Sequence, residues 1–244
     1  MPYRSVFEPL ETLSFVAAVT DHIRLGTSVI DALFHSPVVL ARRFATLDQL
    51  SVGRTVAGLG QGWMPQEFEA ANVPMRRKGA GFEEFVAAMR ACWAQDPVSH
   101  EGRFYRIAPS EVSPKPVQTA IPVLLGSMTP QGVSRAGRIA DGLNPIAVSE
   151  DALRGLVGGF RAAATAAGRD PATLTVVARA NVPITADPIT GDRPFLGGSP
   201  AQVAQDVHRI EDLAVDQIFF SDSSGNDIEA HVGLLGELQA AILG

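Results

Sequence analysis

The sequence predicts an α/β fold built around a parallel β-sheet. Short apolar runs rich in β-branched residues alternate along the 244-residue chain with longer amphipathic stretches, which is the order of repeated strand–helix units. Hydrophobic residues make up 46% of the chain, enough for one large core. The predicted strands, of which 142–148 is the weakest, are residues 23–30, 55–60, 121–126, 142–148, 174–182 and 217–222.

Helices are predicted between these strands from one-sided apolar stripes and end signals. Ser36 and Pro37 suit the N-cap and first turn of one helix, and Gly53 follows its expected end. Ser199 and Pro200 mark a second capped start. An extra helix is expected at the beginning of the chain. The predicted helical segments are residues 9–20, 40–50 (the stripe that follows Pro37), 82–92, 153–160, 203–210 and 235–242.

Two long segments interrupt the alternation, residues 96–120 and residues 183–199. Excursions of that length in a compact α/β domain are usually functional loops or lids, so both are predicted to be insertion loops. Nothing between the predicted elements has the composition of an interdomain linker. Residues 1–244 are therefore predicted to form a single domain.

Composition and charge narrow the class of partner. The formal net charge of -6 gives no basic surface for a phosphate backbone, so a small-molecule substrate is expected rather than nucleic acid. No apolar run reaches the roughly 18 residues of a membrane span. Cys92 is the single cysteine, and the first residues lack the features of a secretory signal. We expect a cytoplasmic protein without membrane association.

Six predicted strands fit an open doubly wound sheet better than a closed barrel, which needs eight. The segment GLGQGW, residues 58–63, resembles a phosphate loop at first sight. However, no G-x-G-x-x-G opens a helix, and no acidic residue ends a strand about 20 residues later. From the residues alone, an open-sheet nucleotide-binding module and a barrel both remain open.

Either architecture places ligands beyond the carboxyl ends of the strands. The residues expected there are small and polar: Thr27, Ser28, Asp31, His35, Gly60, Gln61, Gly62, Gly126, Ser127, Asn144, Arg179, Asn181, Ser221 and Asp222. The segment GSMTP, residues 126–130, leads into a helix and could bind phosphate at its N-terminus, or Gly126 and Ser127 could simply turn the chain and cap the helix.

Candidates for acid–base or metal chemistry are few. His35 is the one weak catalytic candidate, and its alternative is a surface or capping histidine. The histidines and Cys92 lack ligand spacing, so no metal site is predicted. Cys92 lies in an apolar stripe and is expected to be a packing residue. Because so few residues could act as acid, base, nucleophile or metal ligand, we expect a reaction whose difficult chemical step is carried out by a cofactor.

Three segments in order resemble a known family. They are residues 22–54, residues 58–84 and residues 122–142, which contain TSVI, GLGQGWMPQEF and PVLLGSMTP. They are similar to the bacterial luciferase-like monooxygenase superfamily, and most similar to its coenzyme F420-dependent oxidoreductases of the actinobacterial type. The resemblance implies a (β/α)8 TIM-barrel fold with a flavin or deazaflavin at the C-terminal mouth.

The resemblance also implies roles for individual residues. The segment Thr27, Ser28 and Val29 matches the bulge that backs the cofactor ring, with a non-prolyl cis peptide expected between Ser28 and Val29. The match after the next strand implies that Gly60, Gln61, Gly62 and Gln66 flank the cofactor. The match after the strand 121–126 implies a phosphate-binding turn at Gly126, Ser127 and Met128.

Two departures from the family pattern accompany the resemblance. The family's first strand, helix and second strand have no counterpart, so the barrel is expected to be N-terminally incomplete, which explains the six strands. A branch that acts on a sugar phosphate keeps a carboxylic acid where Trp63 stands, which argues against that substrate. The alternative is a purely structural role for Trp63, as an aromatic side chain packed beneath the following helix.

The resulting hypothesis is an F420-dependent oxidoreductase that transfers a hydride between the deazaflavin and a small organic substrate. An FMN-dependent luciferase-like monooxygenase is the first alternative, because motifs that hold the two cofactors overlap. A non-catalytic or truncated cofactor-binding barrel subunit is the second. A homodimer is expected, since the family commonly dimerises and an incomplete barrel needs cover.

Overall fold

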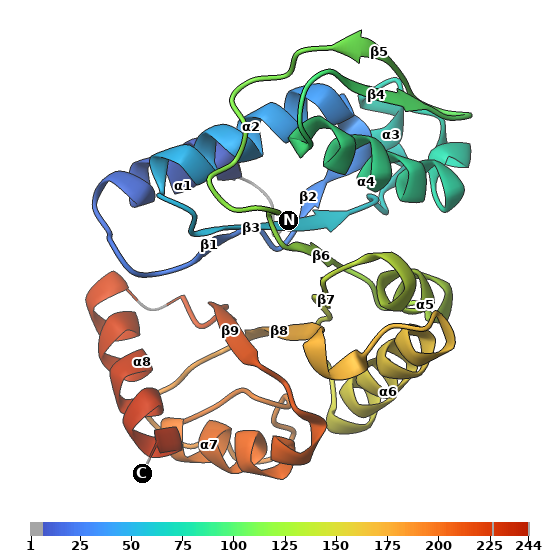
Figure 1. Cartoon of the computed structure of the whole chain (residues 1–244). Helices are drawn as coiled ribbons and strands as arrows, with labels where there is room; N and C mark the ends of the chain where they lie inside the picture. Colours follow the sequence, from blue (N-terminus) through green and yellow to red (C-terminus); the bar gives the residue numbers. More distant parts are fainter. Residues whose placement is uncertain (1–6, 226, 244) are drawn as a thin grey trace. The chain divides into compact units, whose positions relative to one another are not determined.

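A computed structural model describes residues 7–225 and 227–243 of the chain (Figure 1). The chain forms two compact units, Met1–Gly126 and Ser127–Gly244. Each of the six predicted strand segments contains a β-strand, so the prediction of an α/β fold with parallel strands is confirmed.

The first unit contains a parallel sheet centred on β3 (Thr55–Gly60). β1 (Leu25–Gly26) and β2 (Ile30–Asp31) pair with the two ends of the same edge of β3, and β6 (Val123–Leu125) pairs with its other edge. The predicted strand 23–30 is therefore interrupted at residues 27–29, where the chain leaves the ladder between β1 and β2.

Three helices of the first unit lie on one side of β1 and β3 (Figure 1): α1 (Pro9–Ala18), α2 (Pro37–Leu50) and α4 (Ala80–Trp93). Their buried faces contribute Leu40, Phe44, Phe85 and Met89 to the core. The stripes that predicted α2 and α4 are these buried faces. The short helix α3 (Pro65–Ala70) and the 3-10 turns η1 (Ala32–Phe34) and η2 (Met75–Arg77) were not predicted.

The predicted excursion 96–120 contains an antiparallel hairpin, β4 (Val98–Glu101) and β5 (Arg106–Ser110). Glu84 of α4 fixes the hairpin turn by accepting hydrogen bonds from the backbone N–H groups of Arg103, Phe104 and Tyr105 at 3.0, 2.7 and 2.7 Å. Desolvation raises the pKa of the Glu84 carboxyl, but these three donors outweigh it and hold the pKa below its ordinary value.

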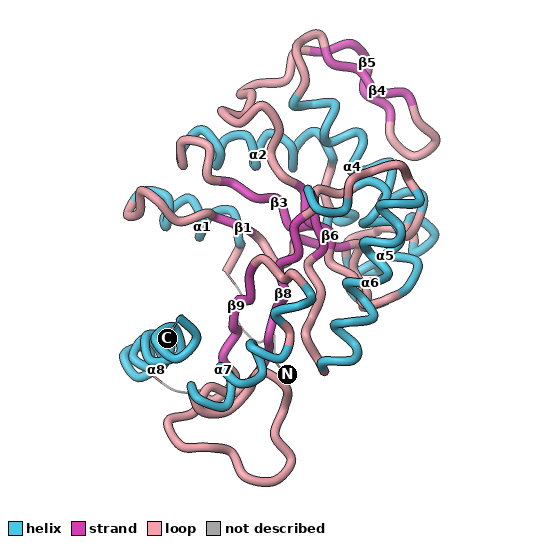
Figure 2. The backbone as a smooth tube through the Cα atoms, turned by 60° about the horizontal axis from the view of Figure 1, so that its bottom comes forward, coloured by secondary structure: helices cyan, strands magenta, loops and turns pink. Residues whose placement is uncertain are grey.

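The second unit has the parallel strands β7 (Gly142–Leu143), β8 (Thr175–Val182) and β9 (Gln217–Asp222), with β8 and β9 side by side (Figure 2). β7 is the short remainder of the weakest predicted strand. Along β8, Val176, Ala178, Ala180 and Val182 are buried, while alternate residues are more exposed. Its helices are α5 (Pro130–Ile139), α6 (Glu150–Ala166), α7 (Pro200–Arg209) and α8 (Ile228–Leu243), with 3-10 turns η3 (Pro171–Thr173) and η4 (Glu211–Leu213).

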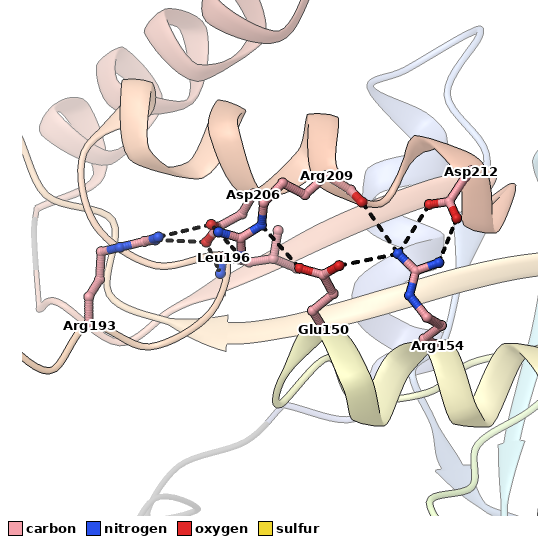
Figure 3. Close-up of polar contacts among 7 residues, drawn as sticks. All are labelled: Glu150, Arg154, Arg193, Leu196, Asp206, Arg209 and Asp212. Carbon is pink, nitrogen blue, oxygen red and sulfur yellow. Dashed lines mark hydrogen bonds and ion pairs between the residues drawn. The ribbon is translucent and has the colours of Figure 1, made fainter.

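The second predicted loop, residues 183–199, is anchored to α7 by a buried ion pair (Figure 3). Arg193 donates two hydrogen bonds to Asp206, at 2.7 and 2.9 Å, and the Leu196 N–H donates to the same carboxylate at 2.8 Å. The Asp206 side chain is 0% exposed. Because of these contacts, the part of the loop that leads into α7 is fixed within its own unit.

Candidate functional site

The strand register brings three predicted site positions together at the carboxyl edge of the first unit's sheet. Asp31, at the end of β2, is the register partner of Gly60, at the end of β3. The Gly126 N–H donates to the Leu59 carbonyl at 2.9 Å, which places Gly126 beside the same end of β3. The ends of β2, β3 and β6 thus form one edge, made of glycine backbone and a carboxylate.

The interruption between β1 and β2 lies against β3. The expected cis peptide between Ser28 and Val29 is present. The Thr27 hydroxyl donates to the Gly58 carbonyl at 2.7 Å and accepts from the Gly58 N–H at 3.0 Å. A Cβ on Gly58 would lie 1.7 Å from the Thr27 carbonyl oxygen, so only glycine permits this approach.

Gly60 and Gly62 keep the same edge free of side chains of their own. A Cβ on Gly60 would lie 2.6 Å from Val29 Cγ2, so a larger residue would displace the segment that follows the cis peptide. Gly62 has a φ of 75°, and a Cβ there would lie 2.9 Å from the Phe34 ring. Both glycines are buried, so the lack of a side chain at these positions allows Val29, Phe34 and Phe68 to pack closely against this end of β3.

The polar residues of the loop after β3 have different environments. The Gln61 side chain accepts a hydrogen bond from the Gly79 N–H at 2.9 Å, which ties the loop to the start of α4. Gln66 is exposed on α3. Trp63 is 67% exposed, so the alternative that it packs beneath the following helix is wrong. The residue that packs there is Phe68, whose ring meets Phe34 edge to face with centroids 4.9 Å apart.

Asp31 is the titratable group at the glycine edge. Its Oδ1 accepts from the Gly62 N–H at 3.0 Å. Burial raises the pKa of Asp31, and the nearby Glu67 carboxylate raises it further, while the Gly62 hydrogen bond and Lys78 act in the opposite direction. The sequence placed Asp31 among the residues that follow strands, but gave no sign that it would be buried against the loop.

His35 lies just after η1 and before α2. Desolvation, together with the charge of Arg43 on α2, lowers the pKa of His35, and Glu8 partly opposes this. The imidazole is thus neutral at pH 7. The charged groups that act on His35 belong to the helical side of the unit, whereas those around Asp31 belong to α3 and the turn before α4. His35 stays a candidate, without a contact to the glycine edge to support it.

The predicted phosphate-binding turn continues into the second unit, where Ser127 and Met128 begin. Thr129 is the N-cap of α5, and its side chain accepts from the Gly132 N–H at 3.2 Å. Ser127 Oγ accepts from the Thr129 N–H at 3.2 Å, and Met128 Sδ accepts from the Ile146 N–H at 3.2 Å. The helix is therefore capped by Thr129, not by Ser127.

Within residues 7–225 and 227–243, no group of three or more histidine, cysteine, aspartate or glutamate side chains is arranged to hold a metal ion. No helix in this part of the chain has the length and apolar composition needed to cross a membrane.

Parallel strands alternating with helices define a barrel-type α/β protein, the class of fold in which ligands bind at the carboxyl ends of the strands. Residues 1–189 match the luciferase-like monooxygenase family, and the chain belongs to this family. The family assignment made from sequence motifs is thus confirmed.

Among the relatives of this chain, one is named for coenzyme F420 and another for FMNH(2). An uncharacterized protein of Mycobacterium tuberculosis is 40% identical over 141 residues, 57% of this chain and 50% of that protein. The F420-dependent glucose-6-phosphate dehydrogenase of Kineococcus radiotolerans is 34% identical over 134 residues, 53% of this chain and 39% of that enzyme. The FMNH(2)-dependent dimethylsulfone monooxygenase of Pseudomonas putida is 29% identical over 155 residues, 62% of this chain and 42% of that enzyme. The chain thus spans half or less of the length of these relatives.

Solved structures confirm the fold class over almost the whole chain. The monooxygenase RslO1 from Streptomyces bottropensis superposes with a TM-score of 0.83 at 25% identity, covering 97% of this chain and 82% of that one. The coenzyme F420 dependent tetrahydromethanopterin reductase from Methanopyrus kandleri gives a TM-score of 0.82 at 19% identity, covering 94% of this chain and 86% of that one. The chain therefore has the luciferase-like TIM-barrel type of fold.

Proposed function

We propose that this protein is an F420-dependent oxidoreductase that transfers a hydride between the deazaflavin and a small organic substrate. The observation that carries the proposal is the meeting of Asp31, Gly60 and Gly126 at the carboxyl ends of β2, β3 and β6, where ligands bind in parallel α/β folds. Relatives named for F420 support this choice of cofactor. The proposed cofactor residues are Thr27, Ser28, Val29, Gly60, Gln61, Gly62, Gln66 and Gly126, with Ser127 and Met128 following in the chain.

The residues of the first unit fit such a group. A β-carbon at Gly60 or Gly62 would clash with Val29 or Phe34, so the glycines let the ends of β2 and β3 pack closely and fix the backbone on which the cofactor would lie. Thr27 and Gly58 hold the backbone before that edge through their paired hydrogen bonds. When bound, the deazaflavin supplies the carbon that accepts or donates the hydride. The protein supplies position and a fixed electrostatic environment.

Hydride transfer from an alcohol-like substrate also releases a proton from the substrate oxygen. His35 is the candidate acceptor, because its lowered pKa leaves the imidazole neutral at pH 7, the form that takes up a proton. Trp63 cannot serve as a proton donor in place of a carboxylic acid. Since the sugar-phosphate branch keeps an acid at that position, a sugar phosphate is not the substrate that we propose.

Two other functions compete with this proposal. The similarity to an FMNH(2)-dependent monooxygenase favours an FMN-dependent luciferase-like monooxygenase on the same fold. A non-catalytic or truncated cofactor-binding barrel subunit is the third possibility, because the chain covers only part of its relatives. A homodimer in the cytoplasm completes the proposal, and light scattering after size exclusion tests the dimer.

A titration of the purified protein with oxidised F420 and, separately, with FMN tests the cofactor. We expect F420 to quench protein fluorescence with saturation and FMN to bind at least tenfold more weakly. Tight FMN binding without F420 binding would replace the proposal by the monooxygenase. Saturable F420 binding without reduction by any of a panel of small alcohols would support the non-catalytic subunit.

A further inference from the structure

The Asp31 carboxylate occupies a position that the proposed cofactor role of the neighbouring residues does not explain. It lies at the end of β2, in register with Gly60. Its Oδ1 accepts the Gly62 N–H at 3.0 Å and would lie 3.0 Å from a Cβ on Gly60. The carboxylate therefore accepts the Gly62 N–H and lies beside Gly60, within the loop that follows β3.

We propose that Asp31 is a positioning residue: its ionised carboxylate fixes the loop Gly60–Trp63 in the conformation that receives the cofactor, and its protonation releases that loop. This inference rests on the proposed function for the identity of the ligand. A hydrogen bond to an ionised acceptor is roughly twice as strong as one between neutral groups. Gly62 has a φ of 75°, so the loop needs such a contact to hold one conformation among those that glycine allows.

The environment of Asp31 moves its titration upward from the ordinary pKa of an aspartate. Burial raises the pKa of Asp31, with Glu67 on α3 acting in the same direction and Lys78, just after η2, acting against it. An acid whose pKa is higher in the folded state binds more protons there than when unfolded. Stability therefore falls as the pH rises from the unfolded pKa of about 3.9 to the folded pKa. Ionised Asp31 is thus kept at a cost in stability, which favours a role in function.

Trp63 provides a direct readout, because it follows Gly62 and is 67% exposed, whereas Trp93 is buried and donates to the Ala41 carbonyl. The fluorescence anisotropy of the apo protein is measured between about pH 8 and pH 4. We expect anisotropy to fall with one protonation midpoint, and this transition to be absent in W63F. In D31N the side chain is neutral at every pH, so the anisotropy should stay at the low value that wild type reaches when Asp31 is protonated, independent of pH.

Three further variants separate Asp31 from its neighbours. E67Q removes a like charge and should shift the midpoint to lower pH. H35N should leave the midpoint unchanged, since His35 is not among the groups that act on Asp31. E69Q, on the exposed side of α3, is the matched control and should also leave it unchanged. A midpoint that persists in D31N or does not move in E67Q would overturn the inference.

Cofactor titration of the same variants completes the test. D31A should weaken F420 binding on the order of tenfold at pH 7, because the Gly62 N–H loses its acceptor. D31N, whose neutral amide accepts a weaker hydrogen bond, should weaken F420 binding to the extent that protonation of Asp31 does in wild type, and its binding should lose its pH dependence. If wild type and all variants fail to bind F420 or FMN while the Trp63 transition behaves as described, the proposed cofactor fails and the role of Asp31 in the loop stands. Unchanged binding by D31A would refute the positioning role.

Discussion

Removing Arg193 should release the loop 183–199 from α7. In the native structure, Arg193 bonds both oxygens of the buried Asp206 and also donates to the Gly197 carbonyl at 2.7 Å. The variant R193A deletes these three hydrogen bonds and leaves the carboxylate in place. The loop segment from residue 193 to residue 198 then keeps its backbone hydrogen bonds, the bond from the Leu196 N–H to Asp206 and the packing of the buried Leu196 side chain.

The expected loss of free energy that holds the loop on α7 depends on the groups that still contact Asp206 in R193A. Breaking a buried pair by removing one partner costs about 3–5 kcal/mol when the remaining charge is left uncompensated. Here the Leu196 N–H stays at 2.8 Å and Arg209 lies 3.3 Å from Oδ1, so compensation is partial. We expect the free energy of local opening of the loop to fall by about 2–3 kcal/mol, equivalent to a 30- to 150-fold increase in the population of the open loop. Replacing Asp206 by alanine leaves no acceptor and should cost at least as much.

Amide hydrogen exchange measures this opening locally. Leu196 and Gly198 donate to Asp206 and to the Pro183 carbonyl, so their exchange reports the anchored part of the loop. Both should exchange faster in R193A, while helix α6 stays protected. The variant R154A, which removes an exposed ion-pair partner of Asp212 in the same network, is the control and should change exchange in the loop much less (Figure 3). Equal protection of the loop in wild type and R193A would refute the reasoning.

The same pair has a defined pH dependence. Desolvation raises the pKa of Asp206, but Arg193 and the Leu196 N–H outweigh it, and the pKa lies below its ordinary value. A depressed pKa means that the pair contributes fully above the unfolded value of about 3.9 and is lost as the pH falls through the folded pKa. Protection of the loop in wild type should therefore persist at pH 5 and decline only below about pH 4, with no such step in R193A.

Three further outcomes are expected. G60A should reduce F420 binding at least tenfold, because its Cβ would lie 2.6 Å from Val29 Cγ2. A Cβ on Gly158, in α6, would have no atom within 4 Å, so G158A should instead stabilise the protein by about 0.5–1 kcal/mol in urea unfolding. E84Q should loosen the hairpin β4–β5, seen as faster exchange of the N–H groups at its turn, and wild type should show the same change only when acidified through the lowered pKa of Glu84. Cys92 should resist a thiol reagent at pH 8 in the folded state and react on unfolding, since burial raises its pKa, against the opposing charge of Lys115.

The alternation of apolar runs predicted the strands and the long helices because both depend on local periodicity. β3 and β8 match their predicted ranges to within one residue at each end. The six-residue helix α3 was missed because it is too short to complete an apolar stripe. The hairpin in residues 96–120 was missed because β4, with the sequence VSHE, has little apolar character and is held by Glu84, which is distant in sequence.

The site was only partly predictable for a related reason. Thr27, Gly60 and Gly62 could be proposed because residues after parallel strands meet at one edge, whatever their side chains. The environment of Asp31 could not, since it depends on Gly62, Glu67 and other residues brought to it by the fold. Burial and neighbouring charge determine a carboxylate's role, and neither is a property of a single short segment.

GLGQGW contains three glycines that sequence reasoning treats as one motif, although the structure gives each a separate reason. Gly58 permits the approach of the Thr27 carbonyl, Gly60 makes room for Val29, and Gly62 adopts a positive φ. All three reasons concern the segment before α2, because Asp31 and Phe34 contact Gly62 from that same segment. None requires a phosphate. The motif is therefore explained by packing between the ends of β2 and β3, and the ligand site that we propose at this edge depends on that packing.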